Sequence, residues 1–438
     1  MDNQRNQPKV SVLMAVKNSE KFVGQTIQSV LDQTFTNFEF IILDDGSTDA
    51  STQIIKQYAE ADSRVKAFYL TSSIGIPCGF KYTVEKGMGE YLARIDGDDF
   101  WEPSKLAKQV ALLDEKPEIG ASSTFVTIVD EQGEPLDNQA SQGRLAHFNA
   151  QNRSHEEWLR TFVLEGSRSA HPSMMVRKSV IDAVGNYNPL LWQLNDFDLW
   201  LRILAKYPIE IIEEPLLNYR WFPEEGGNVS SYSEAVMHRT MFEASIVFDD
   251  YFEKIPNELF YLAFKQEIDA EFSFSDYTED EKTLIKYLIL RTIQSVSWSQ
   301  DAIHLIALNQ LGNAIKHHQV SERLLKQVNL TPIGFIHYDD FPIFYNGAEV
   351  SPTATTQNHL NDLHDYSESL LNLLKVYESK IDYLEKTLQE TQDLMKLYKE
   401  QKEYYEAQMV EKEALEKELE AYHTRPIREM IRKMREKQ

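Results

Sequence analysis

Three carboxylates lie within four residues in the stretch Asp96-Gly97-Asp98-Asp99. The stretch follows a short apolar run, 91–95, whose alternation is typical of a β-strand. In open α/β sheets ligands bind at the carboxyl ends of the strands, so the pattern predicts acids at a ligand-binding edge. Crowded carboxylates repel one another unless a cation or solvent screens them. Mg²⁺ or Mn²⁺, with diphosphate oxygens as further ligands, suits such a site, and a solvated acidic loop is the simpler alternative.

Length and composition bound the classes of protein to consider. The 438 residues allow two or three domains with a sizeable core. A net charge of −24 argues against general binding to nucleic acid, whose phosphates need Lys and Arg, but allows one nucleotide held through a metal. The lone cysteine, Cys78, excludes an intramolecular disulfide, which fits a reducing cytosol. Because the first residues are polar and no run of about 18 apolar residues occurs, we expect a cytoplasmic protein without a membrane-spanning helix.

Alternating strand and helix patterns in the first 130 residues predict an α/β domain. Strand-like apolar runs occupy 10–15, 38–43, 65–70, 91–95 and 121–129, with helical spacing between them. This alternation implies a mostly parallel sheet covered by helices on both faces. Two further strands are expected near 210–212 and 215–221.

The composition changes after about residue 231. Long helical segments with few glycines predict an all-α region up to about 330, and Pro342, Gly347 and Pro352 mark a linker. Residues 363–409 carry a heptad in which eleven of fourteen a/d positions are apolar, which favours a coiled coil over a solvated helix. We therefore expect a homo-oligomer.

The last stretch, 425–438, has six Lys/Arg against two Glu and an apolar helical face. Two interpretations stay open for it. A basic amphipathic tail on an acidic protein would touch anionic lipid, at the inner face of the cell membrane, whereas a charged helix end would lie in solvent.

Four segments together resemble the family 2 glycosyltransferases of the GT-A fold. They are VSVLMAVKN at 10–18, FIILDDGSTD at 40–49, ARIDGDDFWEPSKL at 93–106 and NDFDLWLR at 195–202. The resemblance covers about residues 8–230. It implies a Rossmann-like α/β domain that transfers a sugar, with inversion, from a nucleoside diphosphate sugar to a glycan or polysaccharide hydroxyl, with a UDP-sugar as the favoured donor.

Five parts of the chain are therefore expected. They are a GT-A domain at 1–230, a helical domain at 231–340, a linker at 341–362, a coiled coil at 363–423 and a basic amphipathic tail at 424–438.

The resemblance also implies a set of donor contacts. Asp45 would accept a hydrogen bond from the base, and Asp44 would lie near the ribose or position its loop, although Asp-Asp-Gly-Ser is also a good turn by itself. A dinucleotide site also has an acid after its second strand, but no Gly-x-Gly-x-x-Gly follows the first strand here. Ala15 ends the first strand beside the donor. Lys105 would lie near the donor sugar, or be an exposed helix lysine.

Asp96 and Asp98 resemble the family's metal motif, with Asp99 beside them. A divalent metal there, Mn²⁺ or Mg²⁺, would bridge the diphosphate and neutralise the leaving nucleotide. Arg94 would contact phosphate or pair with these acids, and both readings stay open.

Inversion requires a general base on the acceptor side. Asp196 matches the family's base position, although the family usually has Glu-Asp where this chain has Asn195-Asp196. Asp198 is the competitor, but it points to nearly the opposite side of a helix and has Arg202 four residues on, as in a surface ion pair. We therefore prefer Asp196.

Three further residues are weaker candidates. His171 would touch the diphosphate or metal, or be a hydrogen-bonded structural histidine. Trp192 would stack on a sugar ring or lie in the core. Arg220 belongs to a Tyr-Arg pair. In the family, the position two residues after this Arg often holds a metal-binding histidine; here Phe222 occupies it.

Two classes of function remain. The first is an active glycosyltransferase, and the second is a non-catalytic nucleotide- or glycan-binding scaffold assembled by its coiled coil. The intact Asp45, Asp96, Asp98 and Asp196 favour the enzyme, because a pseudoenzyme would be free to lose them.

Overall fold

The structure is a computed structural model that describes residues 7–222, 234–267, 277–293 and 297–316. The expected linker, coiled coil and basic tail lie outside the described residues. Within the described ranges, none of the helices combines the length and the apolar composition needed to cross a bilayer.

One half of the sheet is parallel and contains the first four strands expected from the sequence. The eight strands follow the order β3-β2-β1-β4-β7-β6-β8-β5. The first four in this order all run in parallel. Their bounds are β1 Val10–Val16, β2 Phe38–Asp44, β3 Val65–Tyr69 and β4 Tyr91–Arg94.

The other half of the sheet is mixed. The short strand β7, Met175–Arg177, lies antiparallel between β4 and β6, Ala121–Val129. Strand β6 runs parallel to β8, Ile209–Arg220, and β5, Phe100–Trp101, pairs antiparallel with β8. The two strands expected near 210–212 and 215–221 are thus one strand, whose register against β6 shifts around Phe125. The prediction of a mostly parallel sheet is confirmed.

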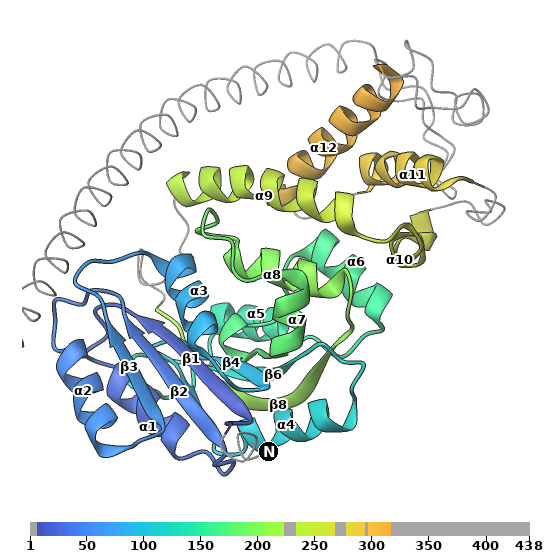
Figure 1. Cartoon of the computed structure of the whole chain (residues 1–438). Coiled ribbons are helices and arrows are strands. Elements are labelled where there is room, and N and C mark those ends of the chain that lie inside the picture. The colour runs from blue at the N-terminus through green and yellow to red at the C-terminus, as the bar shows by residue number, and fades with distance from the viewer. Residues whose placement is uncertain (1–6, 223–233, 268–276, 294–296, 317–438) are drawn as a thin grey trace, which may run out of the picture. The chain divides into compact units, whose positions relative to one another are not determined.

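Helices cover both faces of this sheet (Figure 1). Alternate residues of β1 show the two faces: Leu13 belongs to one buried cluster, whereas Val12 and Met14 belong to the other. The helices of this region are α1 Val23–Leu31, α2 Ser51–Ala61, α3 Ile76–Lys86, α4 Lys105–Glu115, α5 Gln139–Phe148, α6 His155–Glu165, α7 Lys178–Val184 and α8 Asn195–Leu204.

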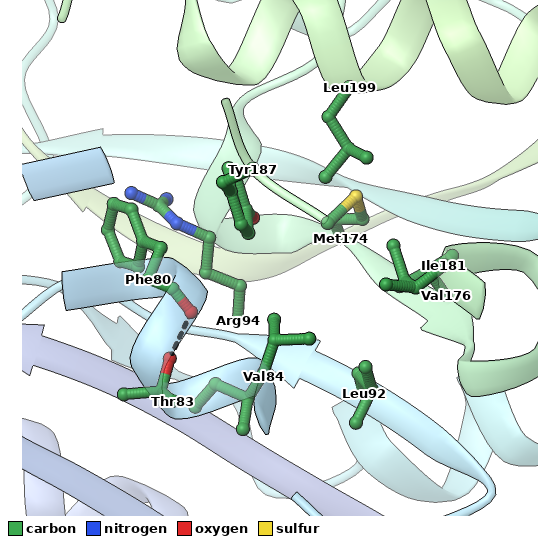
Figure 2. Close-up of a pocket in the computed structure, with 11 residues that line it drawn as sticks. Phe80, Thr83, Val84, Leu92, Arg94, Met174, Val176, Ile181, Tyr187 and Leu199 are labelled. Atoms are coloured by element: carbon green, nitrogen blue, oxygen red, sulfur yellow. Dashed lines mark hydrogen bonds between the residues drawn. The ribbon is translucent and has the colours of Figure 1, made fainter. Parts of the chain in front are cut away.

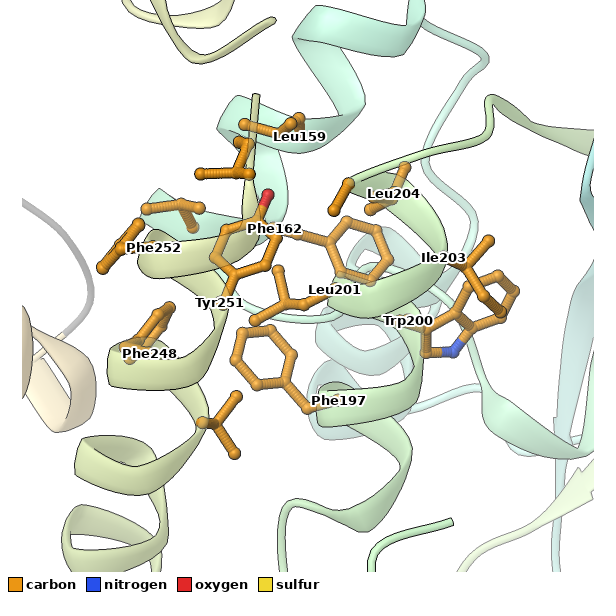
Figure 3. Close-up of a cluster of buried hydrophobic side chains, with 14 of the residues drawn as sticks. Leu159, Phe162, Phe197, Trp200, Leu201, Ile203, Leu204, Phe248, Tyr251 and Phe252 are labelled. Atoms are coloured by element: carbon orange, nitrogen blue, oxygen red, sulfur yellow. The ribbon is translucent and has the colours of Figure 1, made fainter. Parts of the chain in front are cut away.

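The all-α region expected after residue 231 contributes four described α-helices. These are α9 Glu234–Lys254, α10 Asn257–Ala263, α11 Glu279–Thr292 and α12 Ser297–Lys316. Aromatic side chains join α9 to the rest of the core: the ring of Phe248 lies edge-on to Phe197 of α8, with centroids 5.7 Å apart (Figure 3). The hydrophobic core is therefore continuous from α6 and α8 into α9.

Candidate functional site

The acidic loop follows β4 directly, at the carboxyl end of a central strand. Helix α1 holds the loop in place, because the hydroxyl of Thr26 donates to the carbonyl oxygens of Gly97 and Asp99 at 3.1 and 2.7 Å. A Cβ atom at Gly97 would lie 3.1 Å from Cγ2 of Val16. The loop therefore packs against β1 at a distance that glycine permits and a larger residue would strain.

Arg220 fixes the loop from the side of β8. Its Nε donates to the carbonyl of Asp98 at 2.8 Å, and its backbone N–H donates to Oδ1 of Asp99 at 2.8 Å. The remaining guanidinium nitrogens donate to the carbonyls of Asp130 and Glu131 and to the side chain of Gln25. With 1% of its surface exposed and its nitrogens bonded to protein, Arg220 orders the acidic loop rather than facing a ligand.

The three acids have different surroundings. Asp96 is partly exposed and paired with Arg94. Burial, followed by the charge of Asp96, raises the pKa of Asp98 to about 6. Burial and the neighbouring Asp98 and Asp96 charges raise the pKa of Asp99 well above its usual range. Oδ2 of Asp99 is buried and has no hydrogen-bond partner among the described residues. The loop thus crowds carboxylates whose ionised forms are disfavoured by burial and by their mutual repulsion.

These residues fit a divalent metal ion that takes only one or two ligands from the protein. Across the described ranges, no three acidic, histidine or cysteine side chains converge as a ready-made metal cluster. Mg²⁺ and similar ions, however, often take only one or two carboxylates and complete their coordination with phosphate oxygens and water. Asp96 and Asp98 suit this role because both belong to the loop. The side chain of Asp96 is partly exposed, and the pKa of Asp98 is raised. Oδ1 of Asp99 accepts from the backbone N–H of Arg220, whereas its Oδ2 has no hydrogen-bond partner among the described residues, so its role as a third ligand stays a prediction.

Asp44 ends β2 and Asp45 follows it, and both of these acids, expected to bind the sugar donor, accept hydrogen bonds from the protein. Asp44 accepts hydrogen bonds from the backbone of Ser47 and the hydroxyl of Thr52, so it orders its own loop. Asp45 is 5% exposed. It accepts hydrogen bonds from Ser73 Oγ, Ile74 N and Gly75 N at 2.6, 2.7 and 3.0 Å. Asp45 therefore holds the segment that leads into α3.

Ala15 lies near the end of β1, paired with Leu43 of β2. A Cβ at Gly79 would be 3.1 Å from Cβ of Ala15, so α3 approaches β1 closely at this point. The small side chain at 15 is thus needed for packing of α3 beside the loop held by Asp45.

Arg94 lies at the centre of the site. Its guanidinium pairs with Asp96 and lies 4.0 Å from the ring centroid of Phe80. Figure 2 shows the guanidinium beside the ring of Phe80, and Arg94, Phe80 and Tyr187 are among the residues that line a cavity of about 10 Å³. A cavity of this size holds about one water molecule. Nε of Arg94 is buried without a hydrogen-bond partner among the described residues.

His171 is a buried structural histidine in this arrangement. Its Nε2 lies 2.6 Å from the hydroxyl of Tyr187, and its ring packs edge-on against Phe80 and Trp200. Burial and the positive charge of Arg94 hold the pKa of His171 well below its usual range, so the ring is neutral. The hydrogen-bonded alternative for His171 agrees with these contacts.

Asp196 lies in the first turn of α8 and close to the acidic loop. Its Oδ1 accepts from the backbone of Phe197 at 2.7 Å. Burial raises the pKa of Asp196, the charge of Asp96 raises it further, and the charge of Arg94 lowers it. The carboxylate is therefore within electrostatic reach of Arg94, which ends β4, and of Asp96, which follows it.

Asp198 forms the expected pair with Arg202, at 2.6 Å, but the pair is buried rather than on the surface. Arg202 also donates to the carbonyls of Val184, Gly185 and Asn186. The interpretation of a surface pair was wrong, since the side chains of Arg202 and Asp198 are only 12% and 7% exposed.

Lys105 does not reach the acids. It is fully buried at the start of α4, donates to Oε1 of Gln109 at 2.7 Å and lies 4.0 Å from the ring centroid of Trp101. Burial lowers its pKa well below the usual value for lysine. The alternative of an exposed helix lysine is wrong, and the structure does not bring Lys105 together with the other candidates.

Trp192 is 40% exposed and lies over the loop that Asp45 holds. A Cβ at Gly75 would be only 2.7 Å from Cζ3 of Trp192. The indole therefore covers a glycine whose φ of +86° already excludes most side chains. Part of the indole is therefore open to solvent.

Sequence reasoning missed two residues that shape this site. Phe80 supports the Arg94 guanidinium, and Tyr187 holds His171. The turn sequence Gly185-Asn186-Tyr187-Asn188 gave a signal for a loop, but nothing in it indicates which side chain its tyrosine meets.

Comparisons with known proteins identify the family of the chain. The model of the family described as "Glycosyl transferase family 2" matches residues 11–183. An uncharacterized glycosyltransferase of Methanocaldococcus jannaschii is 30% identical over 223 residues, which cover 50% of this chain and 73% of that protein. The O-antigen biosynthesis glycosyltransferase WbnJ of Escherichia coli is 32% identical over 222 residues, 48% of this chain and 79% of that protein. The crystal structure of S. aureus TarS 1-349 in complex with UDP has a TM-score of 0.45 and 14% identity, over 72% of this chain and 93% of that one.

Proposed function

The chain belongs to glycosyltransferase family 2 and is a glycosyltransferase, and from this premise we propose a specific reaction. In our proposal a sugar passes with inversion from a nucleoside diphosphate sugar, with a UDP-sugar favoured, to a hydroxyl of a glycan. The similarity to an O-antigen biosynthesis enzyme supports a surface polysaccharide as the acceptor class. Family membership favours this enzyme over a non-catalytic scaffold.

One observation carries the proposal. Asp196 of α8 and Asp96 of the β4 loop come from distant parts of the sequence, yet the charges of Asp96 and Arg94 both act on the Asp196 carboxyl, and Arg94 also pairs with Asp96. In our proposal the acidic loop faces the diphosphate and the Asp196 carboxylate serves the acceptor hydroxyl. This is the arrangement that direct displacement at an anomeric carbon requires.

In the proposed reaction Asp196 is the general base. Its carboxylate takes the proton of the acceptor hydroxyl while that oxygen forms the new bond to the anomeric carbon. The bond from the anomeric carbon to the diphosphate oxygen breaks, and its electron pair leaves with the nucleoside diphosphate. The raised pKa of Asp196 makes it a stronger base than an ordinary aspartate.

Asp96 and Asp98 are the proposed ligands of the divalent metal, Mn²⁺ or Mg²⁺. When bound, the metal would supply positive charge for the diphosphate oxygens of the leaving group. Arg94 keeps the Asp96 carboxylate in place. Asp99 and Arg220 keep the loop in its shape through the hydrogen bond between Oδ1 and the backbone N–H.

Asp45 is proposed to bind the nucleotide base. A carboxylate has about four acceptor positions, and the structure fills three of them, one on Oδ1 and two on Oδ2. The remaining position on Oδ1 suits an N–H of the base. In this proposal the loop 73–75 forms one wall of the nucleotide site, and Trp192 covers that loop from outside.

Donor hydrolysis tests the proposal without knowledge of the acceptor. UDP release from UDP-glucose, UDP-galactose and UDP-N-acetylglucosamine should be detectable with Mn²⁺ or Mg²⁺ and should vanish with EDTA. Asp196→Asn should lower the rate while leaving calorimetric UDP binding unchanged. UDP binding without turnover of any of these donors would favour the scaffold, and full activity in EDTA would refute the metal site.

Two proposals concern residues outside the described ranges and rest on sequence alone. We propose that the heptad at 363–409 makes the protein an oligomer, so truncation after Gln357 should lower the mass in light scattering to that of a monomer. We also propose that the basic tail binds anionic lipid. Removal of 425–438 should then abolish sedimentation with anionic vesicles at low salt.

A further inference from the structure

A carboxylate of the helical region binds the backbone of the catalytic domain. Glu243 of α9 is 3% exposed. Its Oε1 accepts from the backbone N–H of Trp192 at 2.9 Å, and its Oε2 accepts from those of Gln193 and Leu194 at 2.8 and 2.9 Å. These three residues directly precede α8. One buried carboxylate thus satisfies three consecutive backbone donors of another element.

Helix α8 has no capping side chain at its own N-cap residue. The residue at its N-cap position is Leu194, and no side chain of the described residues caps it locally. The first N–H groups of a helix lack partners within the helix, and the helix dipole makes this end attractive to an anion. Glu243, 49 residues beyond Leu194 in the chain, places a carboxylate at this end by binding the N–H groups of the three residues before the helix, not those of its first turn.

The segment that Glu243 holds is the one that positions Asp196. Asp196 is two residues after Leu194, and its carboxylate is oriented by the N–H of Phe197 in the same turn. Trp192, at the other end of the segment, packs over Gly75, whose N–H is bound by Asp45. The segment therefore touches the acceptor side and the proposed nucleotide side together.

We propose that Glu243 is a positioning residue for catalysis, which makes the helical region part of the catalytic apparatus. It acts by setting the place of the α8 N-terminus and hence of the Asp196 carboxylate. The inference rests on the proposed role of Asp196 as general base.

Attachment of α9 alone does not account for a carboxylate here. Aromatic contacts such as Phe197 with Phe248 already bury α9 against α8. A buried charge is costly unless its hydrogen bonds repay the loss of water, and an apolar side chain would serve attachment as well. The geometry of three N–H donors on one carboxylate instead gives a directional constraint on the turn before Asp196.

Hydrogen exchange tests the positioning step without any substrate. Glu243→Ala should raise the amide exchange rate of peptides that span 192–198 in the full-length protein. The matched control is Glu253→Gln, an exposed acid on the same helix, which should leave these peptides unchanged. Unchanged exchange at 192–198 in Glu243→Ala would overturn the inference.

A double-mutant cycle tests the link to Asp196. The probe is UDP release, in the presence of Mn²⁺, from whichever UDP-sugar the protein hydrolyses fastest. Glu243→Ala should lower this turnover about 10- to 100-fold, as expected for a misplaced catalytic group, with UDP affinity unchanged. In the Asp196→Asn background the same change should have no further effect, because the group it positions is already absent. Glu243→Gln, which keeps one acceptor oxygen, should restore part of the loss.

The outcomes separate the two claims. Equal losses from Glu243→Ala in both backgrounds would mean that Glu243 stabilises the fold without acting through Asp196, and would overturn the inference while leaving the base intact. Full turnover by Asp196→Asn would instead remove the proposed base, and with it the inference. Turnover is expressed per folded molecule. The folded fraction of each variant comes from its thermal unfolding.

Discussion

Arg94 binds Asp96 through both terminal nitrogens of its guanidinium, with Nη2 to Oδ1 at 2.8 Å and Nη1 to Oδ2 at 3.2 Å. The two residues flank Ile95 at the point where β4 ends. The same positive charge lowers the pKa of Asp196 and of His171. One cation therefore links the acidic loop, the buried histidine and the proposed base.

Replacing Arg94 with methionine should change the pH dependence of turnover. The positive charge of Arg94 favours the ionised form of Asp196, so its loss should raise the pKa of that carboxyl further. A general base works only when deprotonated, so the acidic limb of the kcat profile should move to higher pH. The measurement is UDP release as a function of pH.

Arg94→Lys is the control for this change because it keeps a positive charge at the position. Its acidic limb should stay near that of the unaltered protein. An acidic limb at the same pH in Arg94→Met and Arg94→Lys would show that the charge does not act on the base.

Stabilisation by Mn²⁺ should grow with pH. Asp98 has a folded pKa of about 6, above its ordinary value of 3.8. The folded, metal-free protein therefore holds a proton that the unfolded chain releases, and it loses stability as pH rises through this interval. One pKa unit corresponds to about 1.4 kcal/mol, so the loss is at most about 3 kcal/mol. Metal displaces that proton, so the shift in Tm on adding Mn²⁺ should be larger at about pH 7.5 than at about pH 5.5.

Asp98→Asn should separate metal binding from stability. Removing the charge relieves repulsion with Asp96 and Asp99, so the metal-free Tm at neutral pH should rise or stay constant. The shift in Tm with Mn²⁺ should disappear at both pH values. A normal Mn²⁺ shift in this variant would exclude Asp98 as a ligand.

Lys105→Met tests a candidate that the structure separates from the acids. The ammonium group is enclosed, with Gln109 as its hydrogen-bond partner, and methionine fills a similar volume. UDP release should therefore be unchanged. A contact with the donor sugar, as expected from the sequence, would instead make this variant lose donor affinity, and calorimetry with UDP-sugars would detect that loss.

The features that sequence reasoning predicted well are local. The strand ending in Asp96-Gly97-Asp98-Asp99 and the helix that begins at Asn195 depend on periodicity and on turn residues within about ten positions. The sequence pattern alone therefore placed the acidic loop at the carboxyl end of β4 and Asp196 in a first helical turn. Membership of family 2 follows from the same short motifs.

The features that it missed depend on contacts between distant segments. Asp45 is bound by residues 73–75, which lie about thirty positions away. Arg220 binds the acidic loop from 121 positions further along the chain, and Glu243 binds the backbone just before a helix that it follows in the sequence. No periodicity encodes such pairings, because they arise only when the sheet brings the segments together. Burial of Lys105 likewise depends on what covers α4, which its own spacing does not indicate.

Asp196→Asn should remove catalysis with little effect on the fold. The amide keeps the size of the side chain and the oxygen that accepts from Phe197, but it cannot take a proton. General-base catalysis typically contributes about 10²- to 10⁴-fold, so turnover should fall by this factor. Because burial already disfavours the ionised carboxylate, the Tm of this variant should be equal or higher.

Asp198→Asn is the matched variant two residues away, and it should behave in the opposite way. Its carboxylate pairs with Arg202 in a buried position, so the variant leaves a buried guanidinium without its ion partner. Loss of one partner of a buried pair costs about 3–5 kcal/mol, and the three carbonyls that also bind Arg202 should keep the cost near the lower end. Tm should therefore drop, while kcat per folded molecule stays near that of the unaltered protein. If Asp198→Asn abolishes kcat per folded molecule and Asp196→Asn preserves it, the two roles must be exchanged.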